Sequence, residues 1–400
     1  MIVKSNYAAL PGPDVFHRWN LTDASRLYRQ VIRALLSVAT CIVASATLAA
    51  PDATGPYASI MPKAQTSTLI DVERAGSRVV VAGERGHVLY SDDQGANWQQ
   101  ARVPFARMLT GVTFVDDKLG WTVGHQSMVF QSRDGGETWE RQLDGFQFQA
   151  QANADNLIRT RQTYEALSAE LEENPDDSRD MELEDALFAF EDAQFYMEEA
   201  VIPTNLHDVW FLDSNHGWAV GAFGRLIETR NGGRNWVDAS HLVKTLDGFH
   251  LNGITGTGSG EIITAGEGGT IFRSMDKGAT WEQMDSGFYG TFFGVVYDPV
   301  NALVTAFGLA GALYQSRDFG QSWSALKSPI ESSLAGGTVT GDGDTVLVGP
   351  GGLVLVISGA DSSLQTHVQA DRMNQSSILY LEGNTYIVVG AGGVKLAQIK

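Results

Sequence analysis

Short apolar runs separated by glycine turns recur along most of the chain. Seven segments consist of two runs of mostly apolar residues around a glycine-containing turn, which is the pattern of a β-hairpin. They are residues 79–91, 120–132, 217–229, 261–274, 302–316, 344–358 and 385–399. Another apolar run precedes these hairpins and a short strand-like run follows, so each unit is predicted to contain four antiparallel strands.

A polar phrase, Ser/Thr-x-Asp/Asn-x-Gly-x-x-Trp, follows five of the hairpins. It occupies residues 91–98, 132–139, 229–236, 274–281 and 316–323. Successive Trp residues are 41, 97, 45 and 42 positions apart. This period is typical of a propeller blade, and the one long interval contains an insertion of about 55 residues. The chain is therefore predicted to be all-β, with residues 51–400 forming a seven-bladed β-propeller of four-stranded antiparallel blades.

The last unit ends after its third strand. We expect residues 57–63 to supply the missing outer strand, because this would close the ring and remove two exposed sheet edges.

The polar phrase is predicted to be structural. Its Asp or Asn can accept hydrogen bonds from turn N–H groups, its glycine can adopt a positive φ, and its Trp can bury a large apolar face. The residues given this role are Asp93, Trp98, Asp134, Trp139, Asn231, Trp236, Asp276, Trp281, Asp318 and Trp323. Equivalent turns in a ring of blades lie too far apart for these acidic side chains to form one catalytic or metal site.

The phrase is similar to the Asp box of bacterial-neuraminidase-type repeats. Residues 208–236, DVWFLDSNHGWAVGAFGRLIETRNGGRNW, resemble a blade of the photosystem II stability and assembly factor family. The resemblance covers residues 65–400 apart from the insertion. It implies a seven-bladed propeller that is lumenal in photosynthetic members and exported in other bacteria. A basic patch of the photosynthetic members is implicated in contact with the reaction-centre protein, whereas this chain is strongly acidic.

The insertion at residues 146–204, between blades two and three, is predicted to be an α-helical hairpin. Helical spacing of apolar residues runs through 155–173 and 179–200, and Asp155 is the expected N-cap. Residues 151–202 contain 15 acidic and three basic residues, a net charge of −12. In a four-stranded meander, the connection that carries the insertion emerges on the same face as the Gly-x-x-Gly turns, opposite the Asp boxes. We call this the top face.

The top face combines variable turns with the added hairpin, so we expect it to bind another protein. The predicted contact residues are Glu84, Arg85, His125, Gln126, Phe188, Phe195, Tyr196, Phe223, Arg225 and Glu267. An alternative is that the hairpin only packs its apolar stripe on the propeller and leaves its charges in solvent.

Charge and the N-terminal segment indicate the compartment and the class of partner. The net charge of −19 argues against nucleic acid or an anionic membrane surface as a partner. Residues 1–50 combine basic residues with a short apolar run at 34–50, which predicts a secretory signal peptide, with an N-terminal anchor helix as the alternative. The remaining chain has no cysteine and no predicted membrane span. We expect a periplasmic protein, or a lumenal one in a photosynthetic cell, that serves an envelope or membrane complex.

No motif predicts catalysis, a metal or a cofactor. A sialidase-like glycoside hydrolase is the main alternative, and it requires an arginine cluster at the channel mouth with a Tyr–Glu pair. A lectin-like module is a third possibility, which aromatic residues along the top face would favour. The histidines lack metal-ligand spacing, and no phosphate-binding loop precedes a helix. We therefore predict a non-catalytic protein-binding scaffold.

Overall fold

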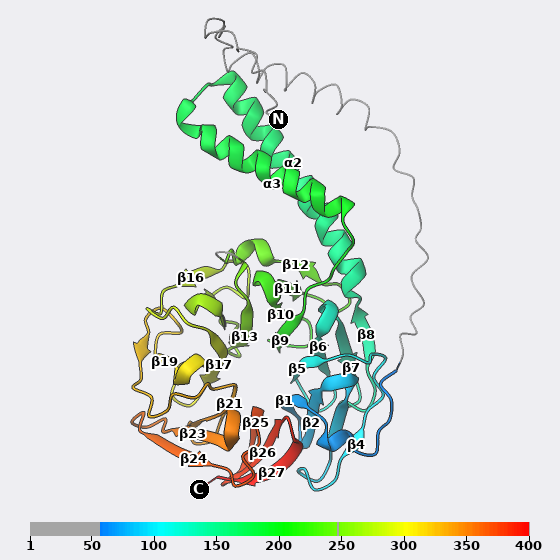
Figure 1. Cartoon of the computed structure of the whole chain (residues 1–400), viewed down its shortest axis with the longest axis vertical. Helices are drawn as coiled ribbons and strands as arrows, with labels where there is room; N and C mark the ends of the chain where they lie inside the picture. The colour runs from blue at the N-terminus through cyan, green and yellow to red at the C-terminus, as the bar shows by residue number, and fades with distance from the viewer. Residues whose placement is uncertain (1–56, 246–247, 400) are drawn as a thin grey trace, which may run out of the picture. The chain divides into compact units, whose positions relative to one another are not determined.

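The computed structural model describes residues 57–245 and 248–399, so the predicted signal peptide at 1–50 lies outside the described residues. Seven antiparallel sheets form a ring around a central channel (Figure 1). Six of these sheets have four strands and one has three, each strand pairing with the next in sequence. The predicted seven-bladed propeller is confirmed.

The strands follow the repeats closely. Blades one to four comprise β1 (Leu69–Ala75), β2 (Arg78–Gly83), β3 (Val88–Ser91) and β4 (Gln99–Gln100); β5 (Leu109–Phe114), β6 (Gly120–Gly124), β7 (Val129–Ser132) and β8 (Glu140–Leu143); β9 (Leu206–Phe211), β10 (Gly217–Gly221), β11 (Leu226–Thr229) and β12 (Val237–Asp238); and β13 (Leu251–Gly256), β14 (Ile262–Gly266), β15 (Ile271–Ser274) and β16 (Glu282–Met284). Blades five to seven comprise β17 (Phe292–Asp298), β18 (Leu303–Gly308), β19 (Leu313–Ser316) and β20 (Ser324–Ala325); β21 (Gly336–Val339), β22 (Thr345–Val348), β23 (Leu353–Ile357) and β24 (Leu364–Val368); and β25 (Gln375–Glu382), β26 (Thr385–Gly390) and β27 (Gly393–Gln398).

The expectation that residues 57–63 complete blade seven is wrong. This segment lies along blade one instead: the Ala58 N–H donates to the Val103 carbonyl at 2.9 Å, and the Met61 N–H donates to Gln100 Oε1 at 2.9 Å. Ala58 is buried in the same apolar cluster as Val103 and Phe105, and this burial holds the segment there. Blade seven has three strands in the part of the chain that the structure describes.

Blade seven is instead joined to blade one through side chains. The Arg74 guanidinium of β1 donates to the carbonyls of Tyr380 and Leu381 in β25, at 2.9 and 2.8 Å. Ser377 of β25 donates to the Asp71 carboxylate at 2.9 Å. We call this junction between blade seven and blade one the seam, because the first and last blades of the chain meet there.

The Asp boxes have the predicted internal hydrogen bonds. In blade two, Ser132 Oγ accepts from the Gly136 N–H at 2.8 Å, and Asp134 Oδ1 accepts from the Thr138 N–H at 3.0 Å. The indole N–H of Trp139 donates to the Gly136 carbonyl at 3.0 Å. The indole N–H groups of Trp236 and Trp281, by contrast, have no hydrogen-bond partner within the described residues.

Each Asp-box glycine packs closely against the second strand of the preceding blade. The pairs are Gly136 with Val80, Gly233 with Trp121, Gly278 with Trp218, Gly320 with Ile263 and, across the seam, Gly95 with Ile387. A Cβ atom built on Gly278 would lie only 2.5 Å from the Trp218 indole nitrogen. The boxes therefore fasten neighbouring blades together as well as forming turns.

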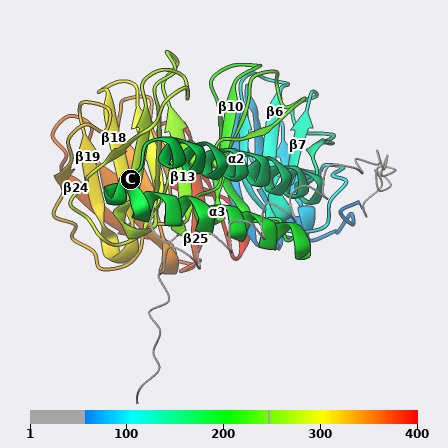
Figure 2. The ribbon, with the colours of Figure 1, turned by 90° about the horizontal axis from the view of Figure 1, so that it is seen from above.

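The insertion folds as a helical hairpin of α2 (Gly145–Glu173) and α3 (Asp180–Glu198), which run antiparallel in contact with each other (Figure 2). Its N-cap is Asp144, which accepts from the N–H groups of Phe146 and Gln147, so the predicted cap at Asp155 is wrong. Tyr164 of α2 stacks on Phe190 of α3 with ring centroids 6.1 Å apart. Neither these helices nor any other in the described residues has an apolar stretch long enough to span a bilayer.

The top face carries single 3-10 turns between the second and third strands. They are η2 (Glu84–Gly86), η3 (His125–Ser127), η5 (Ala222–Gly224), η8 (Glu267–Gly269), η9 (Leu309–Gly311) and η10 (Pro350–Gly352). Helix α2 contacts η3, which confirms that the hairpin leaves the propeller on this face. Three further turns are η1 (Ala64–Thr66), η4 (Asp177–Arg179) and η6 (Ser240–Leu242).

Gly278→Ala is expected to destabilise the propeller considerably more than Gly287→Ala. Both glycines have positive φ, +77° and +70°, so both variants incur a left-handed backbone penalty of about 1 kcal/mol. Only a Cβ at Gly278 meets a neighbour, since nothing lies within 4 Å of a Cβ at Gly287. Urea unfolding should show about 1–3 kcal/mol of additional loss for Gly278→Ala. Equal losses would contradict the proposed contact between blades.

Candidate functional site

The tips of the top turns hold side chains in an unusual backbone conformation. The middle residue of each 3-10 turn is left-handed, with φ of 58° at Arg85, 61° at Gln126 and 58° at Phe223. Gly268 and Gly351 occupy the same position in other turns at little cost. A non-glycine residue in this conformation costs about 1 kcal/mol or more, so three predicted contact residues are held at the tips against a local preference.

Four of the predicted contact residues come together in one cavity of about 580 Å³ between the hairpin and blade three. We call it the hairpin cavity. Phe195 and Tyr196 enter it from the C-terminal end of α3, and Phe223 and Arg225 enter it from η5 and the start of β11. Its remaining lining residues are Gln149, Ala152, Asn153, Asn156, Glu199, Ala200, Ile202, Thr204 and Asp238.

Arg225 holds the base of the hairpin on the propeller. Its guanidinium donates to Asp238 Oδ2 at 2.8 Å, to Gln149 Oε1 at 2.6 Å and to Thr204 Oγ1 at 3.2 Å. The side chain is only 8% exposed, and the carboxylate of Asp238 balances its charge. Phe148, beside Gln149, packs into the core between blades two and three. Arg225, a predicted contact residue, is thus buried at the base of the hairpin and links the propeller to α2.

The Phe223 turn is supported by its neighbour in blade four. The Phe223 N–H donates to His250 Nδ1 at 3.1 Å, and the two rings meet edge to face with centroids 5.0 Å apart. The His250 N–H in turn donates to Glu267 Oε2 at 3.0 Å. Glu267, a predicted contact residue, therefore acts on the hairpin cavity indirectly through His250.

The other predicted contact residues lie elsewhere. Glu84 and Arg85 are on blade one, where Glu84 Oε1 accepts from the Thr68 N–H at 3.2 Å. His125 and Gln126 are on blade two in η3, and Phe188 is an exposed residue further along α3. These five residues do not line the hairpin cavity.

Sequence reasoning missed Gln149, Ile202 and Asp238 of the hairpin cavity. Gln149 lies in a segment expected to precede the first helix, and Asp238 follows an Asp box in a strand with no distinctive motif. Ile202 is 80% exposed, and an exposed apolar residue just after an acidic helix was the one available signal.

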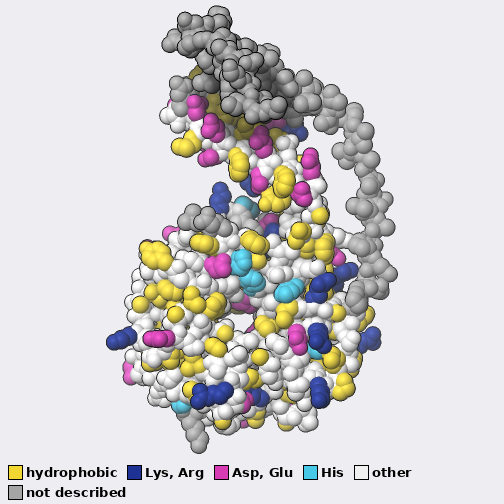
Figure 3. Space-filling view, viewed as in Figure 1, with side chains coloured by type: hydrophobic (Ala, Val, Ile, Leu, Met, Phe, Trp, Pro, Cys, Tyr) yellow, Lys and Arg dark blue, Asp and Glu magenta, His cyan; other side chains and the backbone are white. Residues whose placement is uncertain are grey.

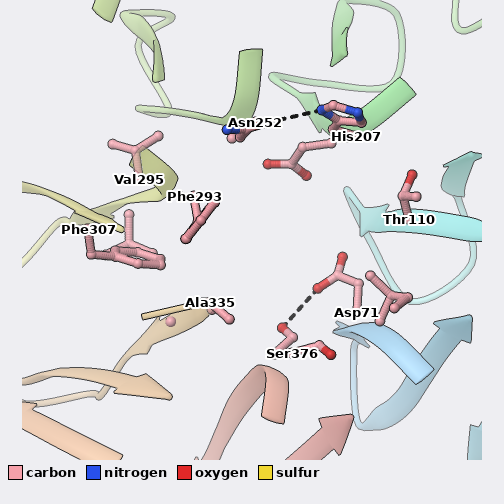
Figure 4. Close-up of a pocket in the computed structure, with 17 residues that line it drawn as sticks. Asp71, Thr110, His207, Asn252, Phe293, Val295, Phe307, Ala335 and Ser376 are labelled. Carbon is pink, nitrogen blue, oxygen red and sulfur yellow. Dashed lines mark hydrogen bonds between the residues drawn. The ribbon is translucent and has the colours of Figure 1, made fainter. Parts of the chain in front are cut away.

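The central channel holds a second, smaller cavity of about 220 Å³ (Figure 4). Asp71 and Asp208 line it, and each connects inner strands of adjacent blades: Asp71 Oδ2 accepts from the Val112 N–H and Asp208 Oδ2 from the Ile254 N–H, both at 2.9 Å. Burial, together with a smaller contribution from the nearby Asp71 carboxylate, raises the pKa of Asp208 to about 7. Burial likewise raises the pKa of Glu73 to about 7.

The channel carboxylates do not resemble the site of a sialidase. No Lys or Arg is among the residues that line this cavity, whereas an arginine cluster is what such an enzyme requires. Within the described residues, no three His, Cys, Asp or Glu side chains are grouped as a metal site. The carboxylates of Asp71 and Asp208 are instead engaged by backbone N–H groups of the sheets.

The family model described as "Photosynthesis system II assembly factor YCF48" matches residues 90–156 and 190–397, so the match omits much of the helical hairpin. The chain belongs to this family. This confirms the resemblance inferred from the Asp boxes and the blade at residues 208–236.

Named members of the YCF48 family share modest sequence identity with this chain. The photosystem II assembly protein Ycf48 of Thermosynechococcus vestitus is 21% identical over 311 residues, covering 76% of this chain and 84% of the relative. The photosystem II assembly lipoprotein Ycf48 of Synechococcus sp. strain CC9902 is 27% identical over 199 residues, covering 47% of this chain. That match spans 57% of the Synechococcus protein.

Solved propellers share the fold. A structure titled "YCF48 bound to D1 peptide" has a TM-score of 0.57 and 16% identity, covering 86% of this chain and 97% of that chain. A structure of YCF48 from Cyanidioschyzon merolae also has a TM-score of 0.57 and 16% identity, with 84% and 96% coverage. At 16% identity, this structural similarity supports only the fold of the chain.

Arg225→Ala is expected to loosen the base of the hairpin in this YCF48-family propeller without unfolding the blades. The variant removes the bonds to Gln149, Thr204 and Asp238 and leaves the Asp238 carboxylate without its ion-pair partner. Amide hydrogen exchange should become at least tenfold faster in the first turns of α2, while β9 to β11 stay protected. Arg230→Ala is the control, because Arg230 pairs only with Glu228 on its own blade. Unchanged exchange in α2 would contradict the role given to Arg225.

Glu73→Gln is expected to change how stability depends on pH. The pKa of Glu73 is raised on folding, so the folded protein binds more protons and the contribution of Glu73 to stability falls as pH rises from about 4.5 to about 7. The variant lacks this loss, so the melting temperature of the variant minus that of the wild type should increase as pH rises across that range. Glu140→Gln, at an exposed position, should show no such trend. A constant difference between Glu73→Gln and wild type would contradict the raised pKa.

Proposed function

We propose that this chain is a non-catalytic, exported assembly factor whose top face binds a segment of an envelope or membrane protein complex. Membership of the YCF48 family supports the assembly role, since its named relatives are photosystem II assembly proteins. A neighbour in fold is titled as bound to a D1 peptide, which supports protein binding as the mode of action.

The observation that carries the proposal is the uncovered apolar surface around the hairpin cavity. Phe195 and Tyr196 on α3 are more than half exposed, and Phe223 is 68% exposed. Hydrophobic side chains gather where the hairpin approaches the propeller (Figure 3). Large aromatic residues grouped around a concave site are typical of a protein-binding surface.

Binding is favoured over catalysis by the state of the acidic groups. The Asp-box aspartates are engaged in turn hydrogen bonds, and the channel aspartates connect strands. A glycosidase needs a carboxylate that is free to transfer a proton and a second one that faces the same substrate. The carboxylates described above serve the fold instead.

An exported location is supported by the sequence of residues 1–50 and by the names of two relatives, which are called lipoproteins. The compartment proposed is the periplasm, or the thylakoid lumen if the cell is photosynthetic.

Deletion of residues 151–199, with a short Gly-Ser linker in their place, is expected to abolish the association with the membrane complex. Tagged full-length and deleted chains would be purified from cross-linked membrane fractions and their partners quantified by mass spectrometry. Specific partners should fall at least tenfold, because the deletion removes α3 and most of α2.

Met275→Ser is the control for this experiment, since Met275 is exposed in an Asp box on the opposite face. It should retain the partners. Thermal melting of the full-length chain, the deleted chain and Met275→Ser would establish that the blades stay folded in all three. Partners that persist after the deletion, or that are lost in Met275→Ser, would contradict binding at the top face.

A further inference from the structure

We infer that the hairpin cavity binds an apolar side chain flanked by Lys or Arg, carried on a segment of the partner protein. This inference rests on the proposed function, because it specifies the chemistry of the partner that the top face receives. Three features favour such a partner: the apolar rim of the cavity, the carboxylates at the end of α3 and the net charge of the hairpin.

The rim of the cavity offers apolar contacts from both sides. Phe195 and Tyr196 project from α3, Ile202 follows that helix, and Phe223 faces them from η5. These four side chains are between 51% and 80% exposed, although they line a cavity of about 580 Å³. A cavity of this size accommodates one or two large side chains, and the surrounding rim can bury the adjoining segment.

The charges at the cavity mouth favour a basic partner. Glu199, the C-cap residue of α3, lines the cavity, and Glu198 directly precedes it at the helix terminus, where the backbone dipole is also negative. Neither carboxylate forms an ion pair within the described residues. The one cation in the cavity lining, Arg225, is already bound by Asp238. Lys or Arg on a bound segment would therefore meet carboxylates that lack a counter-charge.

The net charge of the hairpin distinguishes this partner from a second copy of the chain. Residues 151–202 carry 15 acidic and three basic residues. Two such hairpins brought together would repel each other over several charges, whereas a basic segment would be attracted. A hetero-complex with a basic apolar segment fits both the shape and the charge of the site.

Phe223 allows the inference to be tested without disturbing the fold. Its backbone has φ of 58°, the conformation that glycine adopts at Gly268 and Gly351 in equivalent turns. Phe223→Gly relieves the left-handed backbone but loses the ring contact with His250, so its stability should stay close to that of the wild type while one wall of the cavity is removed. A loss of binding in this variant would report the contact itself.

The probe is a fluorescein-labelled helical peptide of about 18 residues, with leucines and one phenylalanine on one face and lysines on the flanks. Its counterpart carries glutamates in place of the lysines. Binding to the full chain is measured by fluorescence anisotropy at 0.15 M salt. We expect the lysine peptide to bind and the glutamate peptide to bind at least tenfold more weakly. Phe223→Gly and the double variant Glu198→Gln/Glu199→Gln should each bind the lysine peptide at least tenfold more weakly than the wild type does.

Matched controls separate this site from general attraction to an acidic protein. Glu184→Gln/Asp185→Asn removes the same charge from an exposed part of the same helix. Tyr289→Ser removes an exposed aromatic residue that lines a different cavity, of about 500 Å³, beside blade four. Both controls should bind the lysine peptide within twofold of the wild type. Equal weakening in the controls, or wild-type binding by Phe223→Gly, would overturn the inference.

The two proposals fail in different ways. If deletion of the hairpin removes the membrane partners but Phe223→Gly retains both partners and peptide, the top face binds protein and the cavity is not the site. If the cavity variants weaken the peptide but deletion leaves the membrane partners unchanged, the cavity chemistry stands and the proposed function is wrong.

Discussion

Each Asp box approaches the preceding blade at a residue that has no side chain. At Gly278 and Gly233 the backbone lies directly on the indole rings of Trp218 and Trp121, and at Gly95 it lies on Ile387 across the seam. Blades can pack this closely only because the turn offers bare backbone on that side. The polar residues of the box form the turn that presents the glycine, so the repeated phrase serves the assembly of the ring as well as each corner.

The local parts of this architecture could be predicted from the sequence, because they are fixed by short-range chemistry. The hairpins, the Asp-box turns and the two helices depend on residues within about ten positions of each other. The errors concern longer-range competition. Residues 57–63 pair with blade one, where Ala58 is buried, and α2 begins at Gly145, which allows Phe148 to pack on the core between blades two and three. No periodicity encodes either preference.

In the candidate site, too, the local features could be predicted from the sequence and the long-range contacts could not. The aromatic residues of α3 and the tip of η5 were expected on the top face, and the structure brings Phe195, Tyr196 and Phe223 into one cavity. Sequence could not show that Arg225 would be buried between the hairpin and the propeller, since its partners Gln149 and Asp238 are 76 and 13 positions away. The carboxylates of the channel were equally hidden among many acidic residues. The structure shows that Asp71 and Asp208 are engaged by backbone N–H groups of the sheets.

The seam has a consequence for the order in which the molecule is built. Since every blade comes from one continuous stretch of chain, each sheet can form as soon as its own strands have been synthesised. In propellers that share a blade between both ends of the chain, the first and last residues have to meet before that sheet exists. Here Arg74, Asp71 and Gly95 of blade one provide the contacts with blade seven, whose described strands all come from the C-terminal end of the chain. Within the described residues, the ring therefore closes by packing of blade seven on blade one, without a strand shared between the two blades.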